Sequence, residues 1–338
     1  QFEYRNKLPL LFDIGLKPDL GLEIYSVSRK ADTDIIFDSL SANQVAKTDV
    51  SYDLFEVDLV AKHKIFNEAN ELELRFIFSQ YVATIGSFIL PQTSILYPTT
   101  KDKYFVGRNF QLKYTTEYLI PHIDSDISPV GRRLELQYNY EFNKYNKDGE
   151  YEVVDGALLP VYQDFNFHRI ELNYWEHMSL GKGHTLSGRF RGGTIFGPTQ
   201  PDFFDYYLGG LIGMKAYPFY AISGNELMWL NLSYRFPLFK NIDARAGHLY
   251  LDKIFFGLFA DLGNAWNGKM PEISKFKKGV GAELRVKLNS FYLFPTSFFV
   301  SAAYAFDETD RVIRGERIVY GKEWNFYGGI TFDFTIIN

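Results

Sequence analysis

Hydrophobic and polar residues alternate along most of this chain of 338 residues. In residues 131–143, for example, Leu136 and Tyr138 alternate with Glu135 and Gln137. A period of two places successive side chains on opposite faces of a β-strand, whereas a helix repeats about every 3.6 residues. The same alternation recurs at residues 71–78 and 280–288. The pattern therefore predicts an all-β protein whose sheet has one apolar face and one polar face.

The alternation also gives the order of strands and connections. We predict about thirteen strands, near residues 10–17, 20–28, 52–64, 71–83, 104–119, 131–144, 166–176, 184–195, 225–238, 254–263, 279–289, 297–306 and 324–334. Connections at 18–19, 65–70, 120–130, 177–183 and 290–296 are short, whereas those at 29–51, 84–103, 145–165, 196–224, 264–278 and 307–323 are long. Only 239–253 departs from this trend. Short turns on one rim and long loops on the other are typical of a transmembrane antiparallel β-barrel in the bacterial outer membrane, with the short rim in the periplasm.

The odd number of strands needs an explanation, because bacterial single-chain barrels have even numbers. Residues 1–9 are too few for a full crossing, since a tilted strand needs about 9–11 residues. We expect either a weak strand within residues 30–50 or amino-terminal strands that are lost or precede the chain.

Composition favours a sheet in lipid. Aromatic residues make up 18% of the chain, with 32 Phe and 24 Tyr, while 23% of residues are charged and the mean hydropathy is -0.17. An apolar aromatic outside around a hydrated, charged inside has this composition. The sequence contains no run of about 18 apolar residues, which excludes transmembrane helices.

Charge and cysteine content exclude further classes. A net charge of -5 and a pI near 5.8 argue against a nucleic-acid partner, because neutralising phosphates requires clustered Lys and Arg. The chain has no Cys, which excludes disulfides, Cys metal ligands and a thiol nucleophile. No charged segment followed by an apolar segment opens the chain, so we expect a signal peptide to have been removed or to lie outside it.

The most specific motifs lie in the second half of the chain. Gly209 and Gly210 precede the segment Met-Lys-Ala-Tyr at 214–217, and Gly224 follows it. The next strand ends in Tyr-Arg-Phe-Pro at 234–237, and a further strand contains Phe-Ala-Asp-Leu-Gly at 259–263. From about Leu186 onward the chain resembles the barrel domain of the bacterial surface-antigen superfamily, which includes the BamA, TamA and FhaC outer-membrane assembly and secretion proteins.

The resemblance implies a barrel of sixteen strands whose sixth extracellular loop folds into the lumen. In this superfamily an arginine at the loop tip meets the acid of a Phe-x-Asp-x-Gly motif. The matching loop here is 196–224, and the residues of its lock would be Gly209, Gly210, Lys215, Tyr217, Asp261 and Gly263. Lys215 and Ala216 replace the arginine and glycine of the family's tip, and a lysine lacks the planar bidentate fork of a guanidinium.

Lys215 and Asp261 are the pair that we expect to hold the loop. An inward charge without a partner would be costly, so we predict an ion pair between them. The alternative is that Lys215 is simply solvated at the tip of a loop.

The last predicted strand carries alternating aromatic residues, namely Trp324, Phe326, Phe332 and Phe334. It resembles the C-terminal signal by which the assembly machinery recognises outer-membrane barrels, although residues 335–338 extend past the usual final Phe. Ordinary lipid-facing packing gives the same pattern.

The resemblance also numbers the strands. The strand after loop 196–224 would be the twelfth, which makes the first predicted strand the fourth. We therefore expect the chain to lack, or to conceal, about three amino-terminal strands. We predict one barrel domain over residues 1–338, and no POTRA-like periplasmic module is recognisable.

Residue spacings point away from catalysis and metal binding. The six His residues show no HExxH spacing and no GxSxG motif occurs, so we predict no catalytic residue, metal or cofactor. His168 and Ser187 lie on adjacent predicted strands, but His168 falls on the lipid-facing register, which favours an interfacial polar residue. Asp202 and Asp205 could join Asp261 in an acidic cluster, although acids in loops are more often solvated.

Charges of both signs occupy the inward registers. These residues are Lys113, Arg133, Arg169, Arg189, Arg191, Arg235, Arg285 and Lys287 together with Glu135, Glu171 and Glu283. Their side chains either pair across strands or line a path for an extended polypeptide.

These observations predict a non-enzymatic outer-membrane barrel that aids the insertion or translocation of other proteins. Its expected partners are membrane lipid, client polypeptides and a periplasmic module or subunit. A weakly closed seam between the first and last strands would offer hydrogen bonds to an incoming strand. The alternatives are a passive pore or structural barrel that serves a partner or fused domain, and a membrane-embedded lipase or protease.

Overall fold

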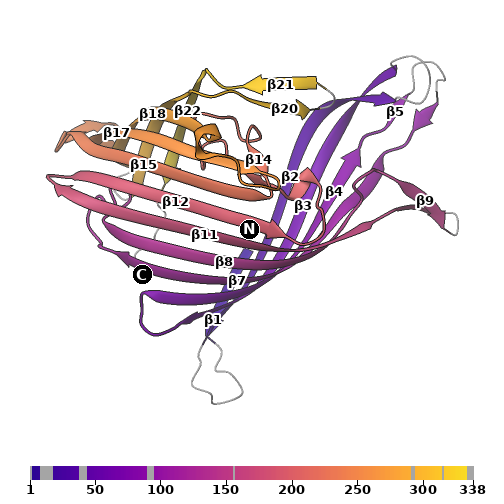
Figure 1. The fold of residues 1–338 in the computed structure, drawn as a ribbon, viewed down its shortest axis with the longest axis horizontal. Helices are drawn as coiled ribbons and strands as arrows, with labels where there is room; N and C mark the ends of the chain where they lie inside the picture. The colour runs from indigo at the N-terminus through magenta and orange to yellow at the C-terminus, as the bar shows by residue number, and fades with distance from the viewer. Residues whose placement is uncertain are drawn as a thin grey trace. The chain divides into compact units, whose positions relative to one another are not determined.

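The computed structural model describes residues 2–7, 18–37, 44–89, 95–154, 157–290, 294–313 and 316–332. Strands dominate these residues (Figure 1), and two short 3₁₀ helices lie at Asp202–Phe204 (η1) and Ile273–Lys275 (η2). None of the helices in the described ranges has the length and apolar character needed to cross a membrane.

One large sheet contains most of the strands. In chain order they are β1 (Phe2–Lys7), β2 (Asp19–Phe37), β3 (Gln44–Lys64), β4 (Asn70–Ile85), β7 (Thr100–Leu119), β8 (Gly131–Tyr145), β11 (Gln163–Gly181), β12 (His184–Phe196), β15 (Glu226–Phe239), β16 (Ala244–Ala246), β17 (Leu249–Trp266), β18 (Lys277–Ser290), β19 (Phe294–Ala305) and β22 (Trp324–Phe332). Each of these strands pairs with the next in this order, except that β16 pairs only with β17, which itself follows β15. The strand pairs from β1 to β4, from β12 to β15, and from β15 through β17, β18 and β19 to β22 are antiparallel, so the predicted all-β antiparallel fold is confirmed.

Four of the six long connections carry small hairpins of their own in the described part of the chain. These are β5 (Phe88–Ile89) with β6 (Leu96–Tyr97), β9 (Tyr151–Val154) with β10 (Ala157–Pro160), β13 (Tyr206–Tyr207) with β14 (Ser223–Gly224), and β20 (Thr309–Ile313) with β21 (Glu316–Tyr320). The connections predicted to be short contain no such hairpin among the described residues, apart from β16 in the exceptional segment 239–253.

The amino-terminal strands differ from the prediction. The predicted strand at 10–17 lies outside the described residues, and β1 pairs with β2 from Phe2↔Ile24 to Lys7↔Asp19. Residues 30–50 hold no separate weak strand in their described part. They form the extended ends of β2 and β3, which stay in register out to Phe37↔Gln44. Alternation identified the centres of these strands, but their polar ends carry no periodic signal.

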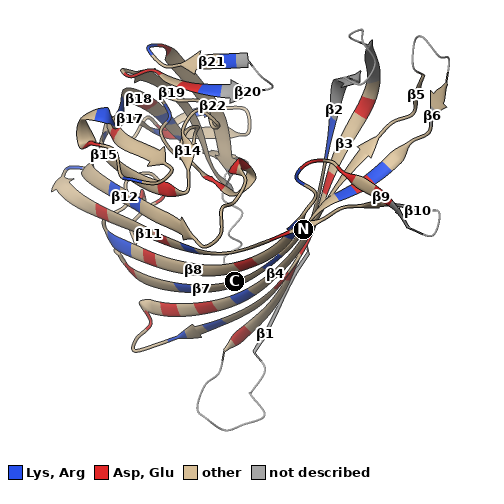
Figure 2. Cartoon of the chain, turned by 45° about the vertical axis from the view of Figure 1, so that its right-hand side comes forward, with Lys and Arg blue, Asp and Glu red and all other residues tan. Residues whose placement is uncertain are grey.

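The chain divides into two compact units. The first contains residues 1–114, 137–169 and 196–201. On one face of its sheet Arg75 binds three carboxylates, those of Glu23 at 2.8 Å, Asp58 at 2.6 Å and Glu73 at 3.0 Å. Charged residues recur along these strands (Figure 2). The opposite face exposes large apolar side chains, including Leu59 and Leu74.

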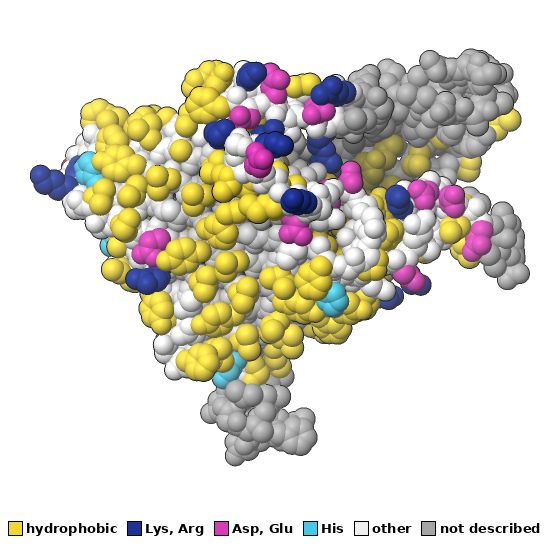
Figure 3. Space-filling model, viewed as in Figure 1, with side chains coloured by type: hydrophobic (Ala, Val, Ile, Leu, Met, Phe, Trp, Pro, Cys, Tyr) yellow, Lys and Arg dark blue, Asp and Glu magenta, His cyan; other side chains and the backbone are white. Residues whose placement is uncertain are grey.

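The second unit contains residues 115–136, 170–195 and 202–338. Its strands also have two unlike faces. Leu230, Leu232, Leu258, Leu284 and Val300 are exposed on one face, and Figure 3 shows hydrophobic side chains gathered over β12 and β15. The other face carries Asp261, Glu283 and Arg235, and we call it the polar face.

Candidate functional site

The segment between β12 and β15 forms a compact structure on the polar face of the second unit. We call residues 202–224 the anchored loop. Backbone hydrogen bonds hold its two arms together, from Leu208 N to Ile222 O at 3.0 Å and from Gly210 N to Tyr217 O at 2.7 Å. At the tip, Met214 N donates to Leu208 O at 2.7 Å. The loop therefore has a defined shape before any contact with the sheet is counted.

Gly209 and Gly210 are necessary for this shape. A Cβ on Gly209 would lie 1.9 Å from the carbonyl oxygen of Pro218, and Gly210 has a φ of 88°, which side chains disfavour. Both glycines are therefore part of the backbone structure of the loop itself.

The tip of the anchored loop is buried against the sheet. Leu208, Met214, Ala216 and Tyr217 are each 0% exposed. Two strand glycines make room for them. A Cβ on Gly263 of β17 would lie 2.9 Å from Leu208 Cδ2, and one on Gly279 of β18 would lie 2.6 Å from Ala216 Cβ. Because these two strand positions have no side chain, the loop approaches the sheet more closely than it could if they carried one.

Tyr217 fixes the tip through its hydroxyl group. The hydroxyl donates toward the carbonyl oxygens of Lys278 at 3.1 Å and Asp307 at 3.0 Å, and it accepts from Asp307 N at 3.2 Å. Burial raises the pKa of Tyr217 to about 12, so the hydroxyl keeps its proton at physiological pH. Asn325 of β22 adds a bond from its Nδ2 to Ala216 O at 2.8 Å.

Lys215 makes an ionic contact at the tip of the loop, but its partner differs from the predicted one. Lys215 Nζ lies 2.8 Å from Glu283 Oε2 on β18, and it also lies 4.9 Å from the centre of the Phe259 ring. Asp261 instead accepts hydrogen bonds from Trp229 Nε1 at 2.9 Å and Asn231 Nδ2 at 2.8 Å. Both bonds reach Oδ1 of Asp261, whereas its buried Oδ2 has no hydrogen-bond partner among the described residues, and the predicted Lys215–Asp261 pair is corrected to Lys215–Glu283.

Glu283 is shared by three cations. Besides Lys215, it binds Arg235 of β15 at 3.3 Å and Arg285 of its own strand at 3.0 Å. Arg235 and Glu283 sit on either side of Gly257, because Arg235 is paired with Gly257 and Gly257 with Glu283 in the sheet register. Since Gly257 has no side chain, the guanidinium can reach across β17.

A cavity of about 530 Å³ lies between the anchored loop and the polar face. Arg189 projects into it between the rings of Trp175 and Trp229, 4.9 Å and 4.8 Å from their centres. Beside it, Arg191 binds Glu171 through two hydrogen bonds of 2.9 Å and 3.0 Å. The cross-strand pairing expected for inward charges therefore occurs in this wall of the cavity.

Other sequence candidates fall elsewhere. Asp202 lies 3.8 Å from Arg311 and is largely exposed, which leaves it outside the contacts of Asp261. In the first unit, His168 stacks on Tyr140. The histidine beside Ser187 is His177, whose Nδ1 lies 2.7 Å from Ser187 Oγ. Among the described residues, no group of three or more His, Cys, Asp or Glu side chains could hold a metal ion.

Trp324 and Phe326 of β22 belong to the apolar face. Trp324 and Phe326 are 57% and 72% exposed. Phe332 pairs with Thr296 in the register of β19, and Phe334 lies outside the described residues.

Sequence reasoning missed the importance of Glu283 and of the turn at 120–130. The alternating pattern places Glu283 among many inward charges, because alternation gives a residue's face but not its neighbours across the sheet. The glycine at 257, one register position away, is the signal that could have indicated the Arg235–Glu283 contact.

Together these features define an all-β protein, in which an antiparallel sheet has one apolar face and carries a loop anchored on its polar face. No family model matches the chain, and no curated protein matches it. Among solved structures, it is similar to BamA from Haemophilus ducreyi lacking POTRA domains 1–3, at 12% identity and a TM-score of 0.48 over 94% of this chain and 65% of that chain. It is also similar to CdiB from Escherichia coli, at 12% identity and a TM-score of 0.46 over 94% of this chain and 53% of that chain. The chain thus spans less than two thirds of either protein.

Proposed function

We propose that this chain is an outer-membrane β-barrel domain that aids the insertion or translocation of other polypeptides. The observation that carries the proposal is the anchored loop. Its tip is buried on the polar face and is held there by the ion pair of Lys215 and the hydrogen bonds of Tyr217. The proposed lock consists of Gly209, Gly210, Lys215, Tyr217 and Gly263 with Glu283, and Asp261 acts beside it.

The two faces of the sheet support a membrane location. Exposed leucine, valine and phenylalanine side chains recur on one face, from Leu230 on β15 to Phe326 on β22. A continuous apolar surface of this kind would cause aggregation in water, whereas lipid accommodates it. The charged residues of the opposite face pair with one another, as expected for a hydrated interior.

The anchored loop argues for a role with polypeptides over a passive pore. It covers part of the polar face and would obstruct the diffusion of solutes along it. The last strand, β22, has a sheet partner on one side only in the described part of the chain. An unpaired strand edge can form backbone hydrogen bonds with another chain, which is how a client strand would add to the sheet.

Reconstitution in vesicles of bacterial polar lipid tests the proposal. The probe is a urea-denatured eight-stranded outer-membrane barrel, whose folding is followed by its heat-sensitive gel mobility. We expect vesicles with this protein to fold the probe several-fold faster than vesicles with an unrelated barrel of similar mass. Equal rates would contradict the proposal, and large stable single-channel currents in the same vesicles would then favour a passive pore.

A further inference from the structure

The connection between β7 and β8, residues 120–130, is more than a short turn. Ser128 N donates to Asp124 O at 2.7 Å, Ile127 N donates to Asp124 O at 3.0 Å, and a ring nitrogen of His122 lies 2.9 Å from Ser128 O. The turn is therefore a compact unit with its own hydrogen bonds. It packs at the ends of the strands opposite those that carry the anchored loop, near the turn between β11 and β12.

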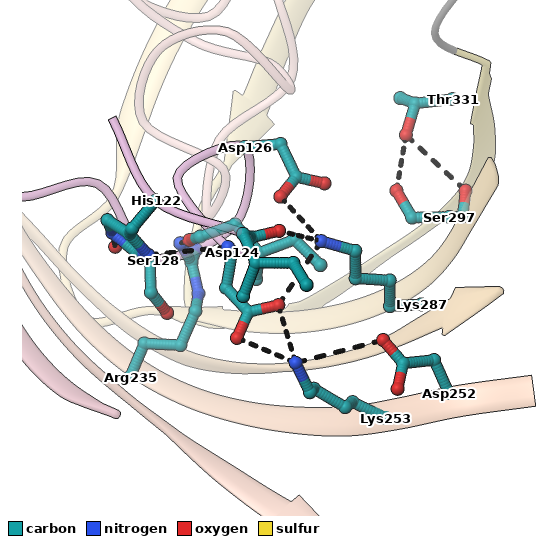
Figure 4. Close-up of polar contacts among 12 residues, drawn as sticks. His122, Asp124, Asp126, Ser128, Arg235, Asp252, Lys253, Lys287, Ser297 and Thr331 are labelled. Carbon is teal, nitrogen blue, oxygen red and sulfur yellow. Dashed lines mark hydrogen bonds and ion pairs between the residues drawn. The ribbon is translucent and has the colours of Figure 1, made fainter. Parts of the chain in front are cut away.

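Two lysines of the polar face hold the turn (Figure 4). Lys253 of β17 donates to both carboxylate oxygens of Asp124, at 3.0 Å and 2.9 Å. Lys287 of β18 lies 3.2 Å from Asp124 and 3.1 Å from Asp126, and it also donates to the carbonyl oxygen of Ile123. Both lysine side chains are largely buried, at 14% and 10% exposed, so these contacts are screened less than surface ion pairs.

The turn also inserts an apolar residue. Ile127 is 1% exposed and the neighbouring Ser128 is 3% exposed. The carbonyl oxygen of Ile127 accepts a hydrogen bond from Arg235 of β15. Removal of the turn would therefore expose Ile127 and deprive Lys253, Lys287 and Arg235 of their acceptors in the turn.

Arg235 links the turn to the anchored loop. Its guanidinium donates to Ile127 O of the turn and contacts Glu283, which in turn binds Lys215 at the loop tip. The two inserted segments thus share one continuous chain of contacts, from Lys215 through Glu283 and Arg235 to Ile127. Neither segment needs to touch the other for a change in one to alter the contacts of the other.

The turn and the loop border different cavities. Arg235, Lys215 and Glu283 line the cavity of about 530 Å³ under the anchored loop. His122, Asp124 and Ser128 of the turn line a second cavity of about 360 Å³, together with Lys253 and Phe255. Arg235 therefore lines the cavity under the loop and at the same time contacts the turn through Ile127 O.

We propose that the 120–130 turn is a gate on the polar face, released when Asp124 leaves Lys253 and Lys287, and coupled to the anchored loop through Arg235 and Glu283. When Lys215 withdraws, Glu283 is free to bind Arg235 more fully. That shift weakens the bond from Arg235 to Ile127 O and favours release of the turn. Because coupling between two sites is reciprocal, release of the turn also favours withdrawal of the loop.

A buried thiol in the turn measures its release. The natural chain has no Cys, and Ser128 is buried with no side-chain hydrogen bond in the structure, so Ser128→Cys introduces one reporter with little change. The rate of its reaction with a maleimide is measured in the full chain in lipid vesicles. Asp124→Asn should raise this rate about tenfold, the effect of losing a charge-assisted hydrogen bond. Asp252→Asn is the matched control, because Asp252 lies 3.7 Å from Lys253 but is not part of the turn.

The coupling has a separate test at the loop tip. Lys215→Gln should raise labelling of Ser128→Cys about fivefold, at the low end of ordinary coupling. Lys278→Gln is the control, because Lys278 pairs at 3.7 Å with Asp307 and is not a partner of Glu283. The double variant of Lys215 and Asp124 should label no faster than Asp124→Asn alone, since the turn is already released.

Unchanged labelling in Asp124→Asn would overturn the gate. Equal labelling in Lys215→Gln and Lys278→Gln would overturn the coupling. Heat-sensitive gel mobility of each variant confirms that the barrel is folded before labelling. The measurement contains no client polypeptide, so it can fail or succeed independently of the proposed role in insertion.

Discussion

The anchored loop and the 120–130 turn are both held on the polar face, but by different forces. The loop tip buries four side chains completely and rests on the bare backbone of Gly263 and Gly279, with Lys215 as its ionic contact to the sheet. The turn buries Ile127 and is otherwise held by lysine–carboxylate pairs and by hydrogen bonds from Lys287 and Arg235 to its carbonyl oxygens.

The difference shows how one sheet can hold two segments under separate control. Packing depends on shape and is insensitive to salt, so the loop should respond mainly to changes in volume. The strength of ion pairs depends on salt concentration and on protonation, so the anchoring of the turn should change with ionic strength and pH. Glu283 and Arg235 are the residues at which the two forms of anchoring meet.

The largest expected effect comes from removing the shared carboxylate. Glu283→Gln leaves Lys215, Arg235 and Arg285 without their common partner, and loss of one member of a buried charge cluster costs about 3 kcal/mol. The loop should open, seen as faster proteolysis of 202–224, whereas labelling of Ser128→Cys should not rise, because Arg235 loses its competing acceptor and keeps its bond to Ile127 O. If the turn opens as well, the proposed competition of Glu283 and Ile127 O for Arg235 is wrong.

A change in volume should separate the two segments. Gly279→Val places a side chain where Ala216 Cβ lies 2.6 Å from the position of a new Cβ, and such overpacking costs about 2 kcal/mol. We expect proteolysis of the loop to accelerate by about tenfold or more, with a smaller, coupled change at the turn. Gly188→Val is the control, since nothing lies within 4 Å of a Cβ at Gly188. Equal cleavage in both variants would show that close packing does not anchor the loop.

Added salt should affect the turn more than the loop, whereas the change in volume affects the loop more than the turn. Raising sodium chloride from about 0.05 M to 1 M shortens the screening length from over 10 Å to about 3 Å and weakens the pairs of Lys253 and Lys287 with Asp124. Labelling of Ser128→Cys should rise about two- to threefold, while proteolysis of the loop changes less. A larger response of the loop than of the turn would contradict the assignment of forces.

The smallest effect is expected from moderate acidification. Burial raises the pKa of Asp124, but hydrogen bonds and charges from Lys253 and Lys287 outweigh it and hold the pKa below its ordinary value. The stabilisation is therefore complete above the ordinary pKa of about 4 and is lost as the pH falls through the lower folded value. A spin label at the exposed Ile123→Cys should keep its mobility from pH 8 to pH 5 and gain mobility below about pH 4.

Other charged groups face the turn, and the experiment must separate them. His122 and Asp126 belong to the turn itself, while Lys182, Lys240, Asp252, Arg235 and Arg285 come from the strands and turns around it. A change in mobility that disappears in His122→Gln would assign the response to the histidine and refute the role given to Asp124.

The sequence predicted the strands and their faces well, because a period of two is a direct consequence of strand geometry. Residues such as Leu136, Glu283 and Asp261 fall on the faces expected for them. The loop at 196–224 was expected as a long connection between strands, and Gly209 and Gly210 occupy positions in it that side chains disfavour.

The ionic partners could not be predicted in the same way. Asp261 and Glu283 lie on the same face, and the choice between them as partner of Lys215 depends on the register of β17 against β18 and on the path of the loop. The register likewise places His177, and not His168, beside Ser187. The role of the 120–130 turn depends on contacts with Lys287 more than 160 residues further along the chain, which no local pattern records.

The presence of Arg235 and Arg285 beside Glu283 has a consequence for how easily the loop can travel. If Lys215 were the sole counter-ion, its movement away would leave the buried Glu283 carboxylate without a partner, and this movement would cost a large free energy. Two arginines that stay behind keep that anion compensated throughout. An outward movement and the return journey can then both occur repeatedly, without an external ion to fill the vacated place.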